Sequence, residues 1–164
     1  MEANPNEKFI TLKLGITNCF LLPCREGFLL IDTSISKYYS RFLNKINEKG
    51  IELRQIRYVL LTHHHGDHTG FLHNLLEASG ARLIVHRAAL PFLAAGVNNE
   101  DMRGTTGVIR LLMRLRKAFH LNPVNNPVFL GDRDIIIEED NDTILREIGV
   151  NAKIVCLPDT QRIL

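Results

Sequence analysis

The sequence of 164 residues lacks several features that mark specialised classes of protein. It contains no apolar run long enough to cross a bilayer, which argues against stable membrane insertion. It also contains no low-complexity tract, internal repeat or linker, so we expect one domain over residues 1–164. Its N-terminus lacks the basic and apolar regions of a secretion signal.

Cysteine is scarce, with three residues and no Cys-x-x-Cys spacing. Cys19, Cys24 and Cys156 have apolar neighbours, which favours reduced thiols over a disulfide framework. Together with the missing secretion signal, this predicts a cytoplasmic protein. Cys19 and Cys156 lie in strand-like runs, so we interpret them as core thiols rather than nucleophiles.

The sequence has little excess charge of either sign, because the formal net charge is only +2 and the sequence pI is about 8.5. So mild a balance, without a long run of like charges, gives no indication of a nucleic-acid partner. The chain is 45% hydrophobic and 23% charged, which is typical of a globular domain with its own core.

The most informative segment follows the apolar run at residues 58–61, where four potential metal ligands occur within six residues. They are His63, His65, Asp67 and His68. Imidazole and carboxylate groups are ligands that zinc prefers, although iron and manganese accept the same donors. The same cluster without a metal, as a hydrogen-bonded loop, is the alternative structural interpretation.

The spacing of these residues predicts two metal positions. His63 and His65 are two residues apart, so in an extended segment their side chains point to the same side and can bind one ion. If a helix begins at Asp67, its first turn directs Asp67 and His68 toward a second ion. Two ions about 3.5–4 Å apart can hold a bridging hydroxide for metal-assisted hydrolysis.

The pattern His-x-His-x-Asp-His resembles the signature of the metallo-beta-lactamase-fold hydrolases. Segments 18–22, 27–33, 130–132 and 152–158 resemble flanking parts of that family, so the resemblance spans nearly the whole chain. It implies an α/β fold, the four-layer αββα sandwich, with two zinc ions in a dinuclear site. It also implies a metal-bound hydroxide that cleaves an ester, thioester, lactone or related bond of a small-molecule substrate, with Asp67 able to orient the hydroxide.

Two departures from the family pattern leave alternatives open. Where the family has Pro-Gly-His-Thr, this chain has Pro158-Asp159-Thr160, and Asp159 is a candidate replacement for the missing histidine. The family also continues beyond the point matched by Leu164, so we expect a sandwich that is incomplete at its C-terminus and a chain that forms homo-oligomers or is poorly stable. A catalytically impaired metal-binding or regulatory member is the second hypothesis, and a nuclease of the same superfamily is the third.

Hydrophobic periodicity predicts an alternation of strands and helices. Strands are expected at residues 9–14, 19–22, 28–31, 58–61, 82–86 and 152–158, and helices at 37–49, 68–79, 88–95 and 104–120. The first three strands should form a meander. The basic helix at 104–120 is interpreted as a solvated packed helix, a cap over the metal cleft, or a segment on an acidic membrane surface.

Other polar residues have weaker interpretations. Asp32 ends an apolar strand and either supports the metal loop or forms a turn. His64 should point away from the ions if its neighbours point toward them, which favours a structural or substrate-contact role. The remaining histidines, His73, His86 and His120, are weak candidates for ligation.

Overall fold

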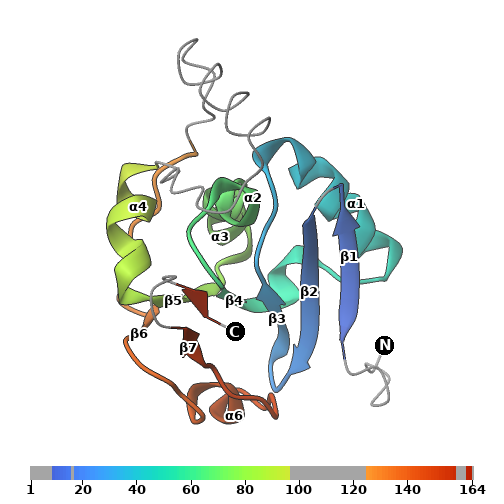
Figure 1. Ribbon diagram of the computed structural model, residues 1–164. Helices are drawn as coiled ribbons and strands as arrows, with labels where there is room; N and C mark the ends of the chain where they lie inside the picture. Colours follow the sequence, from blue (N-terminus) through green and yellow to red (C-terminus); the bar gives the residue numbers. More distant parts are fainter. Residues whose placement is uncertain (1–8, 16, 97–124, 158–161, 164) are drawn as a thin grey trace, which may run out of the picture.

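The computed structural model describes residues 9–15, 17–96, 125–157 and 162–163 (Figure 1). Its centre is a six-stranded sheet in which the strands follow one another in chain order. Strands β1 to β3 pair antiparallel, whereas β3 to β6 pair parallel, so the predicted meander and the mixed α/β class are confirmed. The strands are β1 (Ile10–Leu14), β2 (Thr17–Cys24), β3 (Gly27–Ile31), β4 (Ile56–Leu60), β5 (Arg82–His86) and β6 (Ile135–Ile137).

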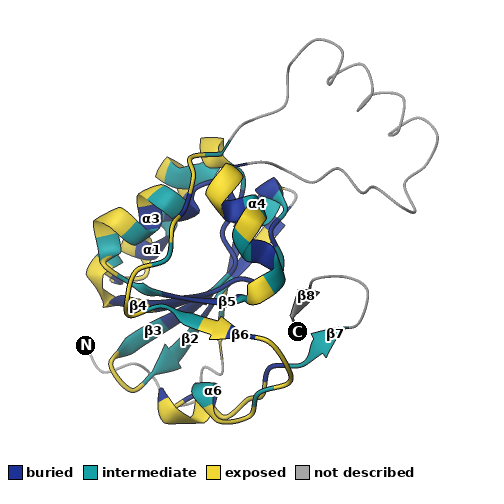
Figure 2. Ribbon diagram, turned by 90° about the vertical axis from the view of Figure 1, so that its left-hand side faces the viewer, coloured by how far each residue is buried: buried dark blue, intermediate teal, exposed yellow. Residues whose placement is uncertain are grey.

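Helices connect the parallel strands and cover one face of this sheet (Figure 2). Glycines in the left-handed conformation end two of them, Gly80 after α3 and Gly96 after α4. The α-helices are α1 (Tyr39–Glu48), α2 (Gly66–Thr69), α3 (Leu72–Ser79), α4 (Leu90–Ala95) and α6 (Ile144–Glu147). Short 3₁₀ turns are η1 (Ser36–Tyr38), η2 (Leu53–Gln55) and η3 (Arg87–Ala89), and β7 (Cys156–Leu157) pairs with β8 (Arg162–Ile163).

The sheet is buried on both faces by two apolar clusters. On the face covered by α1, α3 and α4, Phe42 and Leu75 pack against sheet residues such as Val59. On the other face, Leu60 packs against the segment that contains α6, including Leu145. In β4, Tyr58 and Leu60 are buried on one face and Val59 on the other, which explains the apolar run at the end of this strand and is typical of a strand inside a parallel sheet.

The elements predicted in the first 96 residues agree with the structure, with one difference. The helix expected at 68–79 is two helices, α2 and α3, separated at Gly70 and Phe71. At this break Gly70 lies against the backbone of residues 34–36, so closely that a Cβ would not fit.

The C-terminal part differs more from the expectation. Strand β6 and helix α6 were not predicted, and the strand expected at 152–158 is reduced to the two residues of β7. Ile154 forms only an isolated bridge with Asn141, so the segment lacks a continuous partner strand among the described residues. The helix expected at 104–120, His120 and Asp159 lie outside the described residues.

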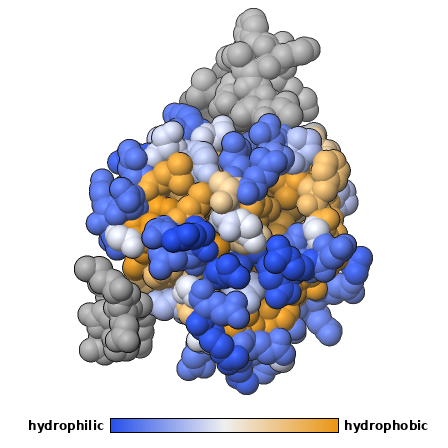
Figure 3. Space-filling model, turned by 180° about the vertical axis from the view of Figure 1, so that it is seen from behind, coloured by the Kyte–Doolittle hydropathy of each residue, from blue (hydrophilic) through white to orange (hydrophobic). Residues whose placement is uncertain are grey.

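Apolar side chains on the surface are gathered in patches between hydrophilic ones when the molecule is viewed from behind (Figure 3). Phe9, Phe129 and Ile136 are large apolar residues with exposed side chains. Within the described ranges, no helix has both the length and the apolar character needed to cross a membrane.

Candidate metal centre

The candidate site lies where two neighbouring parallel strands end. Ile31 of β3 pairs with Leu60 of β4, and the next backbone N–H, that of Asp32, donates to the carbonyl of Leu60 at 2.9 Å. This register places Asp32 beside Leu61 and within hydrogen-bond reach of Thr62, which begins the histidine-rich loop. Ligand sites commonly form at this edge of a parallel sheet, since the loops that leave it converge there.

The loop is held in shape by backbone hydrogen bonds before and within α2. His65 is the N-cap residue, and its carbonyl accepts from the backbone N–H of His68 at 2.8 Å and of Thr69 at 3.0 Å. The Thr69 hydroxyl also donates to this carbonyl at 3.1 Å, and the Asn125 side-chain amide donates to the hydroxyl at 3.0 Å. A distant segment of the chain thereby supports the carbonyl of His65.

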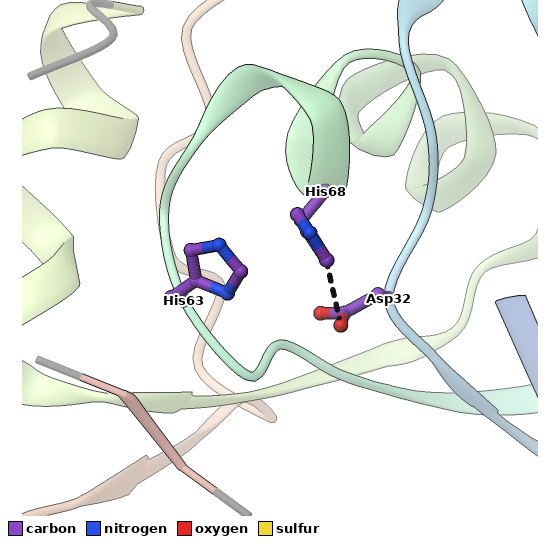
Figure 4. Close-up of side chains that lie close together, drawn as sticks. All are labelled: Asp32, His63 and His68. Atoms are coloured by element: carbon purple, nitrogen blue, oxygen red, sulfur yellow. Dashed lines mark hydrogen bonds and ion pairs between the residues drawn. The ribbon is translucent and has the colours of Figure 1, made fainter. Parts of the chain in front are cut away.

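The four ligands predicted from the sequence lie together around His63. Potential ligand atoms of His63, His65 and Asp67 all lie within 4.8 Å of one another. The His68 ring lies beside the His63 ring (Figure 4), with 4.0 Å between the ring centroids. Its Nε2 is 3.6 Å from Asp67 Oδ2. The proximity of these donors agrees with the predicted cluster, while the assignment of donors to two separate ions stays a prediction.

Asp32 forms a second group of potential donors with His63 and His68, again within 4.8 Å. Its side chain is buried, and its φ of 56° lies in the left-handed region, which aspartate tolerates better than most residues. Oδ1 accepts from the Thr62 backbone N–H at 2.8 Å, and Oδ2 lies 2.6 Å from the Thr62 hydroxyl and 2.8 Å from His68 Nδ1. The carboxylate therefore contacts Thr62 and His68 on either side of the loop, which agrees with the supporting role predicted from its position.

A second set of contacts fixes α2 against the end of β3. The backbone N–H and the hydroxyl of Thr33 both donate to the carbonyl of His68, at 2.9 and 2.7 Å. Nearby, a Cβ at Gly70 would lie 2.5 Å from the backbone nitrogen of Ser36. Only glycine allows α2 to approach the chain this closely, so the position of His68 depends on Gly70.

His64 differs from its neighbours because it is buried away from the donor cluster. Its ring stacks on Phe92 of α4 at 4.1 Å between centroids, which agrees with the structural role predicted for it. In the described part of the chain, neither ring nitrogen has a hydrogen-bond partner. Burial, with the nearby His65, lowers the pKa of His64 to about 4, so its imidazole is neutral.

Two other histidines are engaged away from the cluster. His73 Nδ1 donates to the carbonyl of Pro127 at 2.9 Å, and its Nε2 lies 3.5 Å from Glu77. His86 Nδ1 accepts from the backbone N–H of Ala88 at 3.2 Å, which leaves Nε2 to donate to the carbonyl of Glu138 at 3.3 Å. These contacts agree with the interpretation of both residues as weak candidates for ligation.

The cysteines are free thiols, and Cys19 is fully buried in the sheet. Burial, together with the charge of Asp32, raises the pKa of Cys19 to about 12. Burial also raises the pKa values of Cys24 and Cys156. A thiol with a raised pKa is a poor nucleophile, which supports the interpretation that these cysteines are not nucleophiles. Cys19 is a core thiol, as predicted, whereas Cys156 is only partly buried, so the expectation that it is a core thiol is wrong.

The donor set suits a borderline divalent metal. Three imidazoles and the Asp67 carboxylate are compatible with zinc. His63 belongs to both groups of potential donors, one with His65 and Asp67 and the other with Asp32 and His68. The sequence did not indicate the supporting roles of Thr62 and Asn125. Thr62 could have been recognised as the first polar residue after the buried strand β4. No local signal in the sequence connects Asn125 with Thr69.

The family model of the metallo-beta-lactamase superfamily matches residues 12–151, which includes the whole described site. The chain belongs to the metallo-beta-lactamase superfamily. Its resemblance to that family, inferred from His63 to His68, is therefore confirmed, and so is the fold class.

Curated proteins are similar to parts of this superfamily member, and two of them show the extent of the similarity. A UPF0173 metal-dependent hydrolase from Staphylothermus marinus is 30% identical over 123 residues, covering 72% of this chain and 52% of the relative. The uncharacterized protein YobT from Bacillus subtilis is 33% identical over 60 residues, covering 37% of this chain and 24% of the relative. The chain thus spans between about a quarter and a half of the length of these relatives.

Solved structures of the superfamily share the fold. A Cronobacter sakazakii metallo-beta-lactamase with a HARLDQ motif aligns with a TM-score of 0.57 at 23% identity, covering 80% of this chain and 44% of that structure. GOB-18 from Elizabethkingia meningoseptica also aligns with a TM-score of 0.57, at 19% identity, covering 97% of this chain and 52% of that structure. At these identities the similarity establishes the architecture alone.

Proposed function

We propose that this chain carries the metal centre of a metal-dependent hydrolase, in which His63, His65, Asp67 and His68 bind two divalent ions. The observation that supports the proposal most directly is the convergence of these side chains around His63 at the end of β4. Hydrogen bonds to the backbone carbonyls of His65 and His68 hold the loop, so the donors are positioned before any metal binds. Zinc is the expected metal because imidazole donors predominate.

The chemistry follows from the donors and from the exposure of Asp67. Zinc ions, when bound, polarise a carbonyl oxygen and lower the pKa of water to about 7. The Asp67 side chain is 44% exposed, more than that of His68 at 23%. Its carboxylate is therefore able to accept a hydrogen bond from an attacking water molecule and direct it toward the scissile bond. We assign Asp67 a catalytic role in addition to ligation.

The proposed substrates are small molecules with an ester, thioester or lactone bond. The neutral His64 and the free thiols offer no alternative nucleophile at neutral pH, because burial lowers the pKa of His64 and raises that of Cys19. The name of the Staphylothermus marinus relative, a metal-dependent hydrolase, supports the same class of reaction.

The first test is the metal content of folded protein purified without chelator, measured by elemental analysis. We expect about two ions per chain, and loss of both in a His65→Ala, Asp67→Ala double variant. His73→Ala is the matched control, because His73 contacts Pro127 instead of the cluster. Purified protein should also hydrolyse at least one member of a panel of ester, thioester and lactone substrates.

Two outcomes would contradict parts of the proposal. Well-folded protein that binds no zinc, iron or manganese would exclude a metal-dependent hydrolase. Protein that binds metal and fails on the whole panel would instead favour an impaired metal-binding or regulatory member.

A further inference from the structure

Thr62 links the buried carboxylate of Asp32 to the first histidine of the cluster. Its hydroxyl oxygen lies 2.6 Å from Asp32 Oδ2 and 2.9 Å from His63 Nδ1. The same Oδ2 lies 2.8 Å from His68 Nδ1 (Figure 4). One carboxylate oxygen is thereby connected to two imidazoles, directly to His68 and through a hydroxyl to His63.

Counting protons along this chain assigns the roles of both rings. A carboxylate offers only acceptor positions, so both Thr62 and His68 donate to Asp32. A hydroxyl has one proton, and that of Thr62 is used toward Asp32. Thr62 can then only accept from His63, which must carry a proton on Nδ1. His68 carries a proton on Nδ1 for the same reason.

We propose that Thr62 is a positioning residue that relays the charge of Asp32 to His63 and fixes its Nδ1–H tautomer, leaving Nε2 as the ligand nitrogen. This inference deepens the proposed function, on which it rests for the role of Nε2. The metal-free arrangement already holds both imidazoles in the tautomer that a metal ion needs, so no proton has to move between ring nitrogens on binding.

The same carboxylate of Asp32 orients one proposed ligand of each metal position, His63 through Thr62 and His68 directly. Removal of the Asp32 carboxylate should release both His63 and His68, whereas removal of the Thr62 hydroxyl should release only His63. Thr62→Val tests this difference, since valine keeps the branched shape and removes the hydroxyl. Thr62→Ser should restore the relay, and Thr11→Val on the exposed side of β1 is the matched control.

The decisive measurement is the tautomer of each histidine in metal-free protein, by long-range ¹H–¹⁵N correlation spectra at about pH 8.5, where imidazoles are neutral. In the natural sequence and in Thr62→Ser, His63 and His68 should both carry the proton on Nδ1. In Thr62→Val, His63 should change to the Nε2–H form that an unconstrained imidazole prefers, while His68 should not change. His63→Ala and His68→Ala variants assign the signals.

A second readout is the dissociation constant for zinc, measured by competition with a chelator. Thr62→Val should weaken binding about tenfold, and Thr62→Ser should bind within about twofold of the natural sequence. A His63 proton on Nε2 in the natural protein would overturn the proposal, as would an unchanged tautomer in Thr62→Val. The spectra need no metal, so they test the relay even if the chain proves not to bind zinc. Should Thr62→Val fail to fold, the spectra of the natural protein decide the question.

Discussion

Asp32 and His68 are 36 positions apart in the chain, and their side chains meet with 2.8 Å between Oδ2 and Nδ1. This contact joins the end of β3 to α2 across the loop that contains the other ligands. It depends on the parallel pairing of β3 and β4, which places both strand ends at one edge of the sheet. The orientation of the proposed metal ligands is therefore controlled by a residue outside the histidine motif.

Replacing Asp32 should reduce metal affinity without unfolding the protein. We expect Asp32→Asn to weaken zinc binding about 10–100-fold, since asparagine tolerates the same backbone conformation and lacks the charge that orients His68. Asp142→Asn is the control, because Asp142 is exposed and, in the described part of the chain, contacts its sequence neighbours Thr143 and Arg146. Chelator competition and circular dichroism measure the two effects. Unchanged zinc affinity in Asp32→Asn would contradict the supporting role.

Gly70→Ala should destabilise the protein and displace His68. The added methyl group would lie 2.5 Å from the Ser36 nitrogen and 2.6 Å from the Ser34 carbonyl oxygen, and backbone atoms cannot move away cheaply. We expect a loss of about 1–3 kcal/mol in the free energy of unfolding, measured by urea titration. Gly131→Ala is the control, because its nearest contact would be Asp134 at 3.8 Å. Equal stabilities of the two variants would show that the α2 turn is loosely packed.

His64→Phe should stabilise the fold by about 1 kcal/mol. Phenylalanine keeps the stacking on Phe92 and removes two buried nitrogens that have no partner within the described structure. His64→Ala should have the opposite effect, since it loses the stacked ring. Urea unfolding of metal-free protein compares the three chains. A lower stability of His64→Phe would mean that the imidazole makes a polar contact that matters.

Cys19 should resist thiol reagents in the folded protein. In a Cys24→Ser, Cys156→Ser double variant, we expect no reaction with a disulfide reagent at about pH 8 until denaturant is added. Burial raises the pKa of Cys19 to about 12, so the contribution of the neutral thiol to stability is complete below pH 9 and is lost as the pH rises through 12. The urea midpoint should therefore fall more steeply above pH 9 than in a triple variant with Cys19→Ala. Fast labelling of native protein at pH 8 would contradict the burial argument.

Local pattern was enough to predict most of the first 96 residues. The apolar run before Thr62 and the periodicity of α1 correspond to β4 and to a helix whose Phe42 and Ile46 are buried. These elements follow from spacing, because residues two or about 3.6 positions apart share a face. Strand β6 was missed since three residues are too few to show a period, and only pairing with β5 defines it.

The sequence by itself determined the types and order of the proposed ligands, because four donors within six residues suit few other purposes. It also determined the family, through the same motif. Tertiary structure alone decided which residues control those donors. Thr62 lies beside Asp32 only through the register of two parallel strands, and Asn125 reaches Thr69 across 56 positions of the chain. Such contacts arise from strand pairing and packing over long sequence separations, and local sequence patterns carry no record of them.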